Sequence, residues 1–163
     1  MARTQRGRLL VGRLCAAIAA LGAFHAVQAA PVTAQRIIGA DREPQNWLSH
    51  GRTYDEQRYS PLARINDGNV DRLGLAWSHA TNTTRGLQST PLVIDRRLYA
   101  TGVWSVVYAL DAKTGRELWR YDPQVPRAWG RYACCDAGNR GGAAWVNTLY
   151  VGTLDGRLVA LDA

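Results

Sequence analysis

An internal repeat of 51 residues is the feature that most constrains the fold of this chain. The dipeptide Leu-Tyr at 98–99 recurs at 149–150, and YALDA at 108–112 recurs as VALDA at 159–163 with the same offset. A period of about 50 residues is typical of a β-propeller, in which each blade is a four-stranded antiparallel sheet. The repeat therefore predicts an all-β propeller.

Short runs of β-branched and aromatic residues, separated by turn residues, predict the strands of the blades. The runs are 90–94, 98–101, 106–111 and 116–121 in the first copy, and 143–146, 149–153 and 157–162 in the second. One full blade and part of the next are therefore expected. Blades cover their faces only against each other, and propellers close with about four to eight of them. We therefore expect an N-terminal piece of a longer protein, left by truncated sequencing, a frameshift or a gene remnant.

The composition agrees with a β-rich fold. Six Trp and seven Tyr stand beside a single Phe, and hydrophobic residues make up 47% of the 163 residues. Tryptophan and tyrosine favour packing between sheets, and this hydrophobic content excludes wholesale disorder.

The first 29 residues have the layout of a secretory signal peptide. An arginine-rich start precedes an apolar stretch at 14–27 and a small residue, Ala29, after which cleavage is expected. The apolar stretch is shorter than the roughly 20 residues that cross a bilayer, so it predicts no stable membrane anchor. We assign residues 1–29 to a Sec-type signal peptide and residues 30–163 to a partial propeller.

The formal charge of +7 belongs largely to this N-terminal segment. Four of the 20 basic residues lie in the first 30 positions, where no acidic residue occurs. The remaining 16 basic residues face 13 acidic ones, a balance of about +3 that predicts no nucleic-acid partner.

Two adjacent cysteines, Cys134 and Cys135, are the sharpest local feature of the sequence. An oxidising compartment favours a disulfide between them, and such a bond is strained because consecutive Cα atoms lie only about 3.8 Å apart. Free buried thiols, pairing with other cysteines and a metal thiolate remain open as alternatives. A zinc site is disfavoured because no histidine follows His79.

A turn follows the cysteines, with Arg140 directly before two glycines. Glycines there suggest that the backbone approaches another group closely, and the guanidinium could pair with a carboxylate. A surface loop with a solvated arginine is the alternative.

The sequence around the adjacent cysteines resembles that of a known family. Residues 129–136 (WGRYACCD), followed by Asn-Arg-Gly at 139–141, resemble the signature of the pyrroloquinoline quinone (PQQ) dependent alcohol dehydrogenases. Other stretches similar to this family are 51–54, 58–62, 65–66, 69–70, 90–93, 104–111 and 121–126.

This resemblance implies a periplasmic, eight-bladed propeller that holds PQQ in a central cavity. Cys134 and Cys135 match a vicinal disulfide that forms the floor of the cofactor site, and Arg140 matches an arginine that pairs with a PQQ carboxylate or carbonyl. Gln88 stands where the family usually has a glutamate that hydrogen-bonds the cofactor; glutamine keeps the length and loses the charge. Trp77 and Trp119 match tryptophans that dock neighbouring blades, and residues 75–79 resemble the strand that closes the ring.

The resemblance further implies the two-electron oxidation of an alcohol, with calcium as the usual metal and a cytochrome c-type electron acceptor. The family's calcium ligands, catalytic aspartate and covering tryptophan belong to later blades, so we assign no catalytic or metal-binding residue to this chain and expect it to be inactive alone. Asp136 is interpreted as a loop residue. The sequence has no Cys-x-x-Cys-His motif, so haem c is not assigned.

A non-enzymatic propeller scaffold of the cell envelope is the alternative function. Such scaffolds share the Asp-x-x-x-Gly-x-x-x-Trp repeat seen at Asp111, Gly115 and Trp119. The adjacent cysteines with Asn-Arg-Gly favour the quinoprotein. A non-functional remnant is a third possibility, for which Gln88 is faint support.

Overall fold

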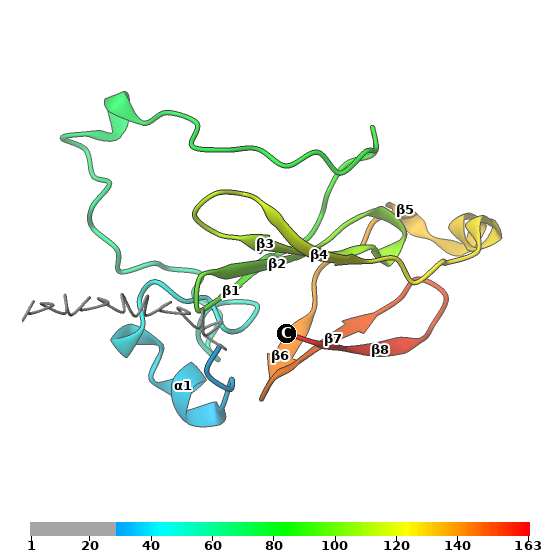
Figure 1. The fold of residues 1–163 in the computed structure, drawn as a ribbon, viewed down its shortest axis with the longest axis horizontal. Helices are drawn as coiled ribbons and strands as arrows, with labels where there is room; N and C mark the ends of the chain where they lie inside the picture. The colour runs from blue at the N-terminus through cyan, green and yellow to red at the C-terminus, as the bar shows by residue number, and fades with distance from the viewer. Residues whose placement is uncertain (1–28) are drawn as a thin grey trace, which may run out of the picture.

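Two antiparallel sheets form the centre of the molecule in a computed structural model that describes residues 29–163 (Figure 1). The first sheet has the order β1 (Leu92–Ile94), β2 (Arg97–Thr101), β3 (Val107–Asp111) and β4 (Glu117–Tyr121). The second has the order β6 (Ala143–Trp145), β7 (Thr148–Gly152) and β8 (Leu158–Asp162), and the short strand β5 (Cys134–Ala137) lies between the two sheets in the chain. Residues 1–28, and with them nearly all of the proposed signal peptide, lie outside the described residues.

The pairing of the strands confirms the predicted repeat. Leu98 pairs with Leu110 in the first sheet, and Leu149 pairs with Leu161 in the second, so both partners are shifted by 51 residues. The first copy forms a complete four-stranded meander and the second forms three strands, as the sequence predicts. Within each sheet every strand pairs with its neighbour in the chain, which is the arrangement of a propeller blade.

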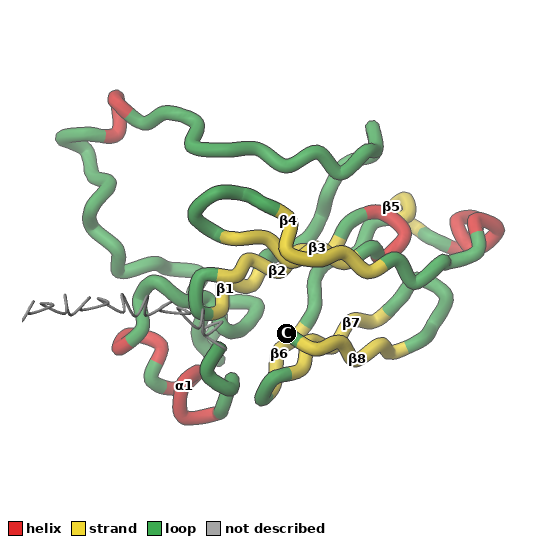
Figure 2. Tube along the Cα trace, viewed as in Figure 1, coloured by secondary structure: helices red, strands yellow, loops and turns green. Residues whose placement is uncertain are grey.

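The remaining regular elements are short (Figure 2). They are α1 (Ala34–Ile38) and the 3₁₀ helices η1 (Ala40–Arg42), η2 (Val70–Arg72), η3 (Val103–Ser105) and η4 (Arg127–Tyr132). None of the helices in residues 29–163 is both long and apolar enough to cross a membrane.

The N-terminal segment is tied to both sheets by backbone pairing. Val32 exchanges two 2.8 Å hydrogen bonds with Val146 before β7, and Trp47 pairs with Val93 of β1. Thr33 caps α1 by accepting a hydrogen bond from the backbone of Arg36. These contacts place α1 beside the two sheets (Figure 1).

The core lies between the sheets and this N-terminal segment. It is built from apolar side chains that are at most 8% exposed: Val32, Ile37, Leu48, Leu92, Ile94, Tyr99, Val107, Ala109, Ala144, Leu149 and Val151. Along β1 and β7 the buried residues alternate with more exposed ones, as expected of strands with one face toward a core.

Residues 55–75 make a long excursion away from the sheets (Figure 1). Almost all of them are exposed, including large apolar side chains such as Tyr59, Leu62 and Leu75. Residues 75–79, which resemble a ring-closing strand, are extended but belong to neither sheet in the described part of the chain.

Trp77 nevertheless contacts the first sheet, as expected of a docking tryptophan. Its Nε1 donates to the carbonyl oxygen of Ala112 at 3.3 Å, in the turn between β3 and β4. Gly115 ends this turn with φ of 71°, and a Cβ added there would lie 2.4 Å from the Trp77 ring. Only glycine fits both the left-handed backbone and the close approach of the indole. Trp119 on β4 packs against the core, 5.9 Å from the ring of Tyr99.

Candidate functional site

A cavity of about 430 Å³ brings together Gln88, Cys134, Cys135 and Arg140, the four residues that the sequence predicts for cofactor binding. They come from three segments: the extended chain before β1, strand β5 and the loop before β6. All four side chains are exposed, so the cavity opens to one side. The other lining residues are Ala133, Asp136, Gly138, Asn139, Gly152, Thr153 and Leu154.

The two cysteines are exposed at the start of β5. They are free thiols, and their Sγ atoms lie 2.7 Å apart, at hydrogen-bond distance. A hydrogen bond with Cys134 is the main cause that raises the pKa of Cys135 above its ordinary value, and the charge of Cys134 adds to this effect. The charge of Arg140 acts in the opposite direction. The disulfide implied by the resemblance stays a prediction.

Gln88 reaches the cysteines directly. Its Nε2 donates to the backbone oxygen of Cys135 at 3.3 Å, which leaves Oε1 as an acceptor toward the cavity lining. A Cβ added to Gly138 would lie 3.1 Å from the Gln88 amide. The glycine therefore gives Gln88 room to approach β5.

Backbone contacts with the chain before β1 hold the loop that carries Arg140 in place. Thr90 N donates to the carbonyl oxygen of Arg140 at 3.1 Å. Gly141 has φ of 127°, and a Cβ there would lie 2.9 Å from the oxygen of Thr90. This confirms the close backbone approach that the two glycines predict. The Arg140 guanidinium lies close enough to Cys135 to act on the pKa of its thiol, and it forms no ion pair with a carboxylate of residues 29–163, so its charge can receive an anion in the cavity.

Asp136 differs from its predicted place, because it lies within β5 and not in a loop. Its φ is 65°, and its carboxylate forms an ion pair with Arg85. The Arg85 guanidinium also lies 5.9 Å from the centre of the Trp104 ring, on which Arg127 stacks at 4.5 Å. This carboxylate is therefore engaged by an arginine beside the cavity.

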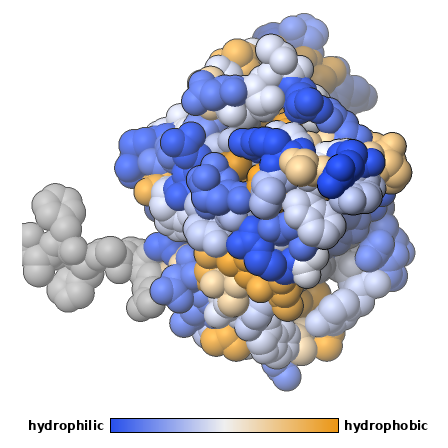
Figure 3. Space-filling view, turned by 90° about the vertical axis from the view of Figure 1, so that its right-hand side faces the viewer, coloured by the Kyte–Doolittle hydropathy of each residue, from blue (hydrophilic) through white to orange (hydrophobic). Residues whose placement is uncertain are grey.

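Figure 3 shows the side of the molecule where β5 and η4 lie: hydrophilic residues cover most of it, and an apolar area is visible between them. Among the described residues no group of three or more His, Cys, Asp or Glu side chains could hold a metal ion.

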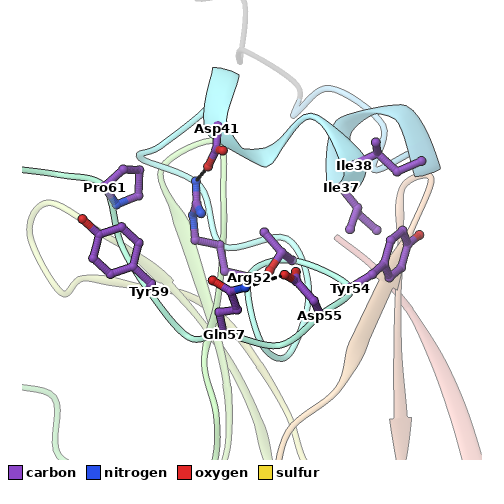
Figure 4. A pocket seen from close by; sticks show the side chains of 10 residues that line it. Ile37, Ile38, Asp41, Arg52, Tyr54, Asp55, Gln57, Tyr59 and Pro61 are labelled. Atoms are coloured by element: carbon purple, nitrogen blue, oxygen red, sulfur yellow. Dashed lines mark hydrogen bonds and ion pairs between the residues drawn. The ribbon is translucent and has the colours of Figure 1, made fainter.

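A second cavity, of about 530 Å³, lies beside α1 and contains none of the predicted cofactor residues (Figure 4). Arg52, only 4% exposed, points from its floor toward Asp41 and donates to that carboxylate at 2.6 Å. Exposed Ile38, Tyr54 and Tyr59 line its sides.

Sequence reasoning missed the residues that hold the first cavity together. Thr101 and Ser105 are 3% and 1% exposed and hydrogen-bond the loop that carries Arg140. Thr101 lies in a stretch without an unusual residue pattern; Ser105 belongs to the family-like run 104–111, and that membership was the only available signal.

Comparison with known proteins places this geometry in a family. Residues 47–163 match the family described as "Glucose/ethanol/alcohol dehydrogenase, beta-propeller domain" of PQQ proteins. Quinohemoprotein alcohol dehydrogenase ADH-IIG of Pseudomonas putida is 60% identical over 134 residues, which are 82% of this chain and 19% of that protein. The 1-butanol dehydrogenase (cytochrome c) of Thauera butanivorans is 51% identical over 72% of this chain and 17% of its own length.

Solved structures agree. The chain resembles ADHIIG of Pseudomonas putida with a TM-score of 0.81 at 59% identity, covering 83% of this chain and 20% of that one. The quinohemoprotein alcohol dehydrogenase of Comamonas testosteroni gives a TM-score of 0.77 at 49% identity, with 81% and 20% covered. The chain thus spans about a fifth of the length of these relatives. The matched family and these similarities together show that the chain belongs to the PQQ-dependent alcohol dehydrogenases and carries part of their β-propeller domain.

Proposed function

We propose that this chain supplies one wall of the cofactor site in a periplasmic PQQ-dependent alcohol dehydrogenase, which oxidises alcohols to aldehydes and passes the electrons to a cytochrome c-type acceptor. The observation that carries the proposal is the meeting of Gln88, Cys134, Cys135 and Arg140 at one cavity. In this proposal residues 1–29 are a signal peptide and residues 30–163 are propeller.

The chemistry of the lining residues fits a flat, anionic quinone. Arg140 offers a charged fork of donors that forms no ion pair among the described residues, and such a fork pairs well with a carboxylate. The cavity volume of about 430 Å³ falls in the usual range for small-molecule sites. Gly138 keeps the space beside Gln88 free of a side chain.

Each of these residues has a separate task. PQQ, when bound, accepts the two electrons that are removed from the alcohol as it becomes an aldehyde. Arg140 orients the cofactor through its negative groups, and Gln88 accepts or donates a hydrogen bond at the cofactor edge. Cys134 and Cys135, joined as a vicinal disulfide, give a rigid floor with little side-chain entropy left to lose.

We place no catalytic base and no metal ligand among the residues of this chain. Calcium, the metal that the family resemblance implies, would be bound by residues outside it. Haem c is likewise not assigned to any residue here, because the sequence has no Cys-x-x-Cys-His motif.

The test is a titration with PQQ, followed by fluorescence, of the protein expressed from its own gene. We expect saturable binding, which weakens about tenfold or more in Arg140→Gln because a charged hydrogen-bonding partner is lost. Arg116→Gln, a change of the same kind on an exposed turn outside the cavity, is the matched control. Mild reduction of the cysteines should also weaken binding. Absence of binding by the unaltered protein would contradict the proposed function, and unchanged binding after reduction would contradict the disulfide floor.

A further inference from the structure

One hydrogen-bond network holds the backbone on both sides of Arg140, and its hub is Asn139. Asn139 Nδ2 donates to Ser105 Oγ at 3.0 Å and to the oxygen of Gly152 at 2.7 Å. Asn139 Oδ1 accepts from Gly141 N at 3.0 Å. The amide therefore fixes the residues directly before and after Arg140.

Ser105 is the buried anchor of this network. It is 1% exposed, and its Oγ accepts a second hydrogen bond, from Leu154 N at 3.1 Å. Both lone pairs of the hydroxyl are therefore used, one toward the Arg140 loop and one toward the turn after β7. Ser105 itself does not line the cavity.

The backbone around Ser105 is held in an unfavourable conformation. Trp104 and Ser105 have φ values of 60° and 61°, so two consecutive non-glycine residues lie in the left-handed region. Such conformations persist where the surroundings over-determine them, and they cluster at functional sites. Here the stacked guanidinium of Arg127 holds Trp104, and the Asn139 amide holds Ser105.

The segment with Gln88 is fastened to the same loop through Thr101. The backbone N of Thr101 donates to Ser89 Oγ at 2.9 Å, and Thr101 Oγ1 lies 3.2 Å from the oxygen of Asn139. Thr101 is 3% exposed. Gln88 and Arg140 thus approach the cavity from two segments that are joined beneath it.

We propose that Ser105 is a positioning residue for the cofactor: by fixing the Asn139 amide, it aims the Arg140 guanidinium into the cavity. The inference rests on the proposed function, because it concerns the binding of PQQ.

The first experiment measures PQQ affinity of Ser105→Ala and Ser105→Gly in the protein expressed from its own gene. Both variants lose the hydroxyl, but glycine adopts a φ of 61° without strain. We expect both to bind PQQ about tenfold more weakly, since a buried network loses an acceptor. Ser49→Ala is the matched control, because the Ser49 hydroxyl is buried without a hydrogen-bond partner among the described residues, and its affinity should not change. Unchanged affinity in Ser105→Gly would overturn the role of the hydroxyl.

The second experiment separates positioning from a general loss of structure. In an Arg140→Lys background, which keeps the charge and loses the planar fork, Ser105→Ala should weaken binding much less than in the unaltered protein. Equal losses in both backgrounds would overturn the inference. Amide exchange without cofactor gives an independent readout: Gly141 and Leu154 should exchange faster in Ser105→Ala. If the unaltered protein binds no PQQ, the proposed function is wrong; if it binds and Ser105→Ala binds equally well, only the positioning role is wrong.

Discussion

Substituting Gly115 with alanine should expose how tightly Trp77 docks on the first blade. Gly115 has φ of 71°, where alanine costs about 1 kcal/mol more than glycine. The new Cβ would lie 2.4 Å from the Trp77 ring, so the indole must move away. This movement breaks the 3.3 Å hydrogen bond to Ala112, worth about 1 kcal/mol, and removes packing worth about another 1 kcal/mol. We therefore expect a total loss of about 3 kcal/mol.

Gly156 provides the matched control. It lies in the turn between β7 and β8 of the second sheet with φ of 83°, and a Cβ added there meets no atom within 4 Å. Gly156→Ala should cost only the backbone penalty of about 1 kcal/mol. The measurement is the free energy of unfolding from urea titrations of both variants, with unchanged slopes.

The excess cost at Gly115 should vanish when Trp77 is absent. In a Trp77→Ala background, Gly115→Ala and Gly156→Ala should destabilise the protein equally, because only the backbone penalty remains. Equal costs of the two glycine substitutions in the unaltered protein would refute the docking of Trp77 on this turn.

Two further predictions concern ionisable groups. Burial alone would raise the pKa of Asp95, but hydrogen bonds from Arg36 and Asn46 hold it below its ordinary value. This stabilisation is present above the ordinary pKa of about 4 and is lost as the pH falls through the lower pKa of the folded protein. Asp95→Asn should therefore make the free energy of unfolding depend less on pH in the acid range. An unchanged dependence on pH would contradict this. In the reduced protein, the raised pKa of Cys135 makes its thiolate scarce at neutral pH. Cys134→Ala removes the hydrogen bond that raises this pKa and should therefore speed the alkylation of Cys135. Equal alkylation rates would count against the hydrogen bond between the thiols.

The fold could be predicted because its strands are local. Within each sheet every strand pairs with its neighbour in the chain, so the alternating pattern and the turn residues between 92 and 121 contain the information for one whole sheet. The 51-residue repeat then predicts the register of the second sheet from that of the first, because the pair Leu98–Leu110 recurs as Leu149–Leu161. The excursion at residues 55–75 was not predictable in this way, because no pairing within the described residues determines its path.

The site was predictable only in part, for a physical reason. Cys134 and Cys135 belong to a rare residue type, and Arg140 follows them in a compact motif before two glycines, so the sequence marks them. Ser105 is a common residue type, and its role depends on a left-handed backbone that usually requires glycine or asparagine. No residue preference announces such a conformation, because contacts from distant segments impose it.

The candidate cofactor cavity is a product of contact between blades. Thr101 ends β2 and Ser105 follows it, whereas Gly152 ends β7 and Leu154 follows it. Asn139 bonds to residues from both groups. The hydrogen bond between Ser105 and Leu154 N also joins the two blades directly. Because the same few bonds dock the blades and orient Arg140, cofactor affinity and blade docking are coupled: a ligand that binds only the docked arrangement must stabilise it, and a substitution that loosens docking must weaken binding.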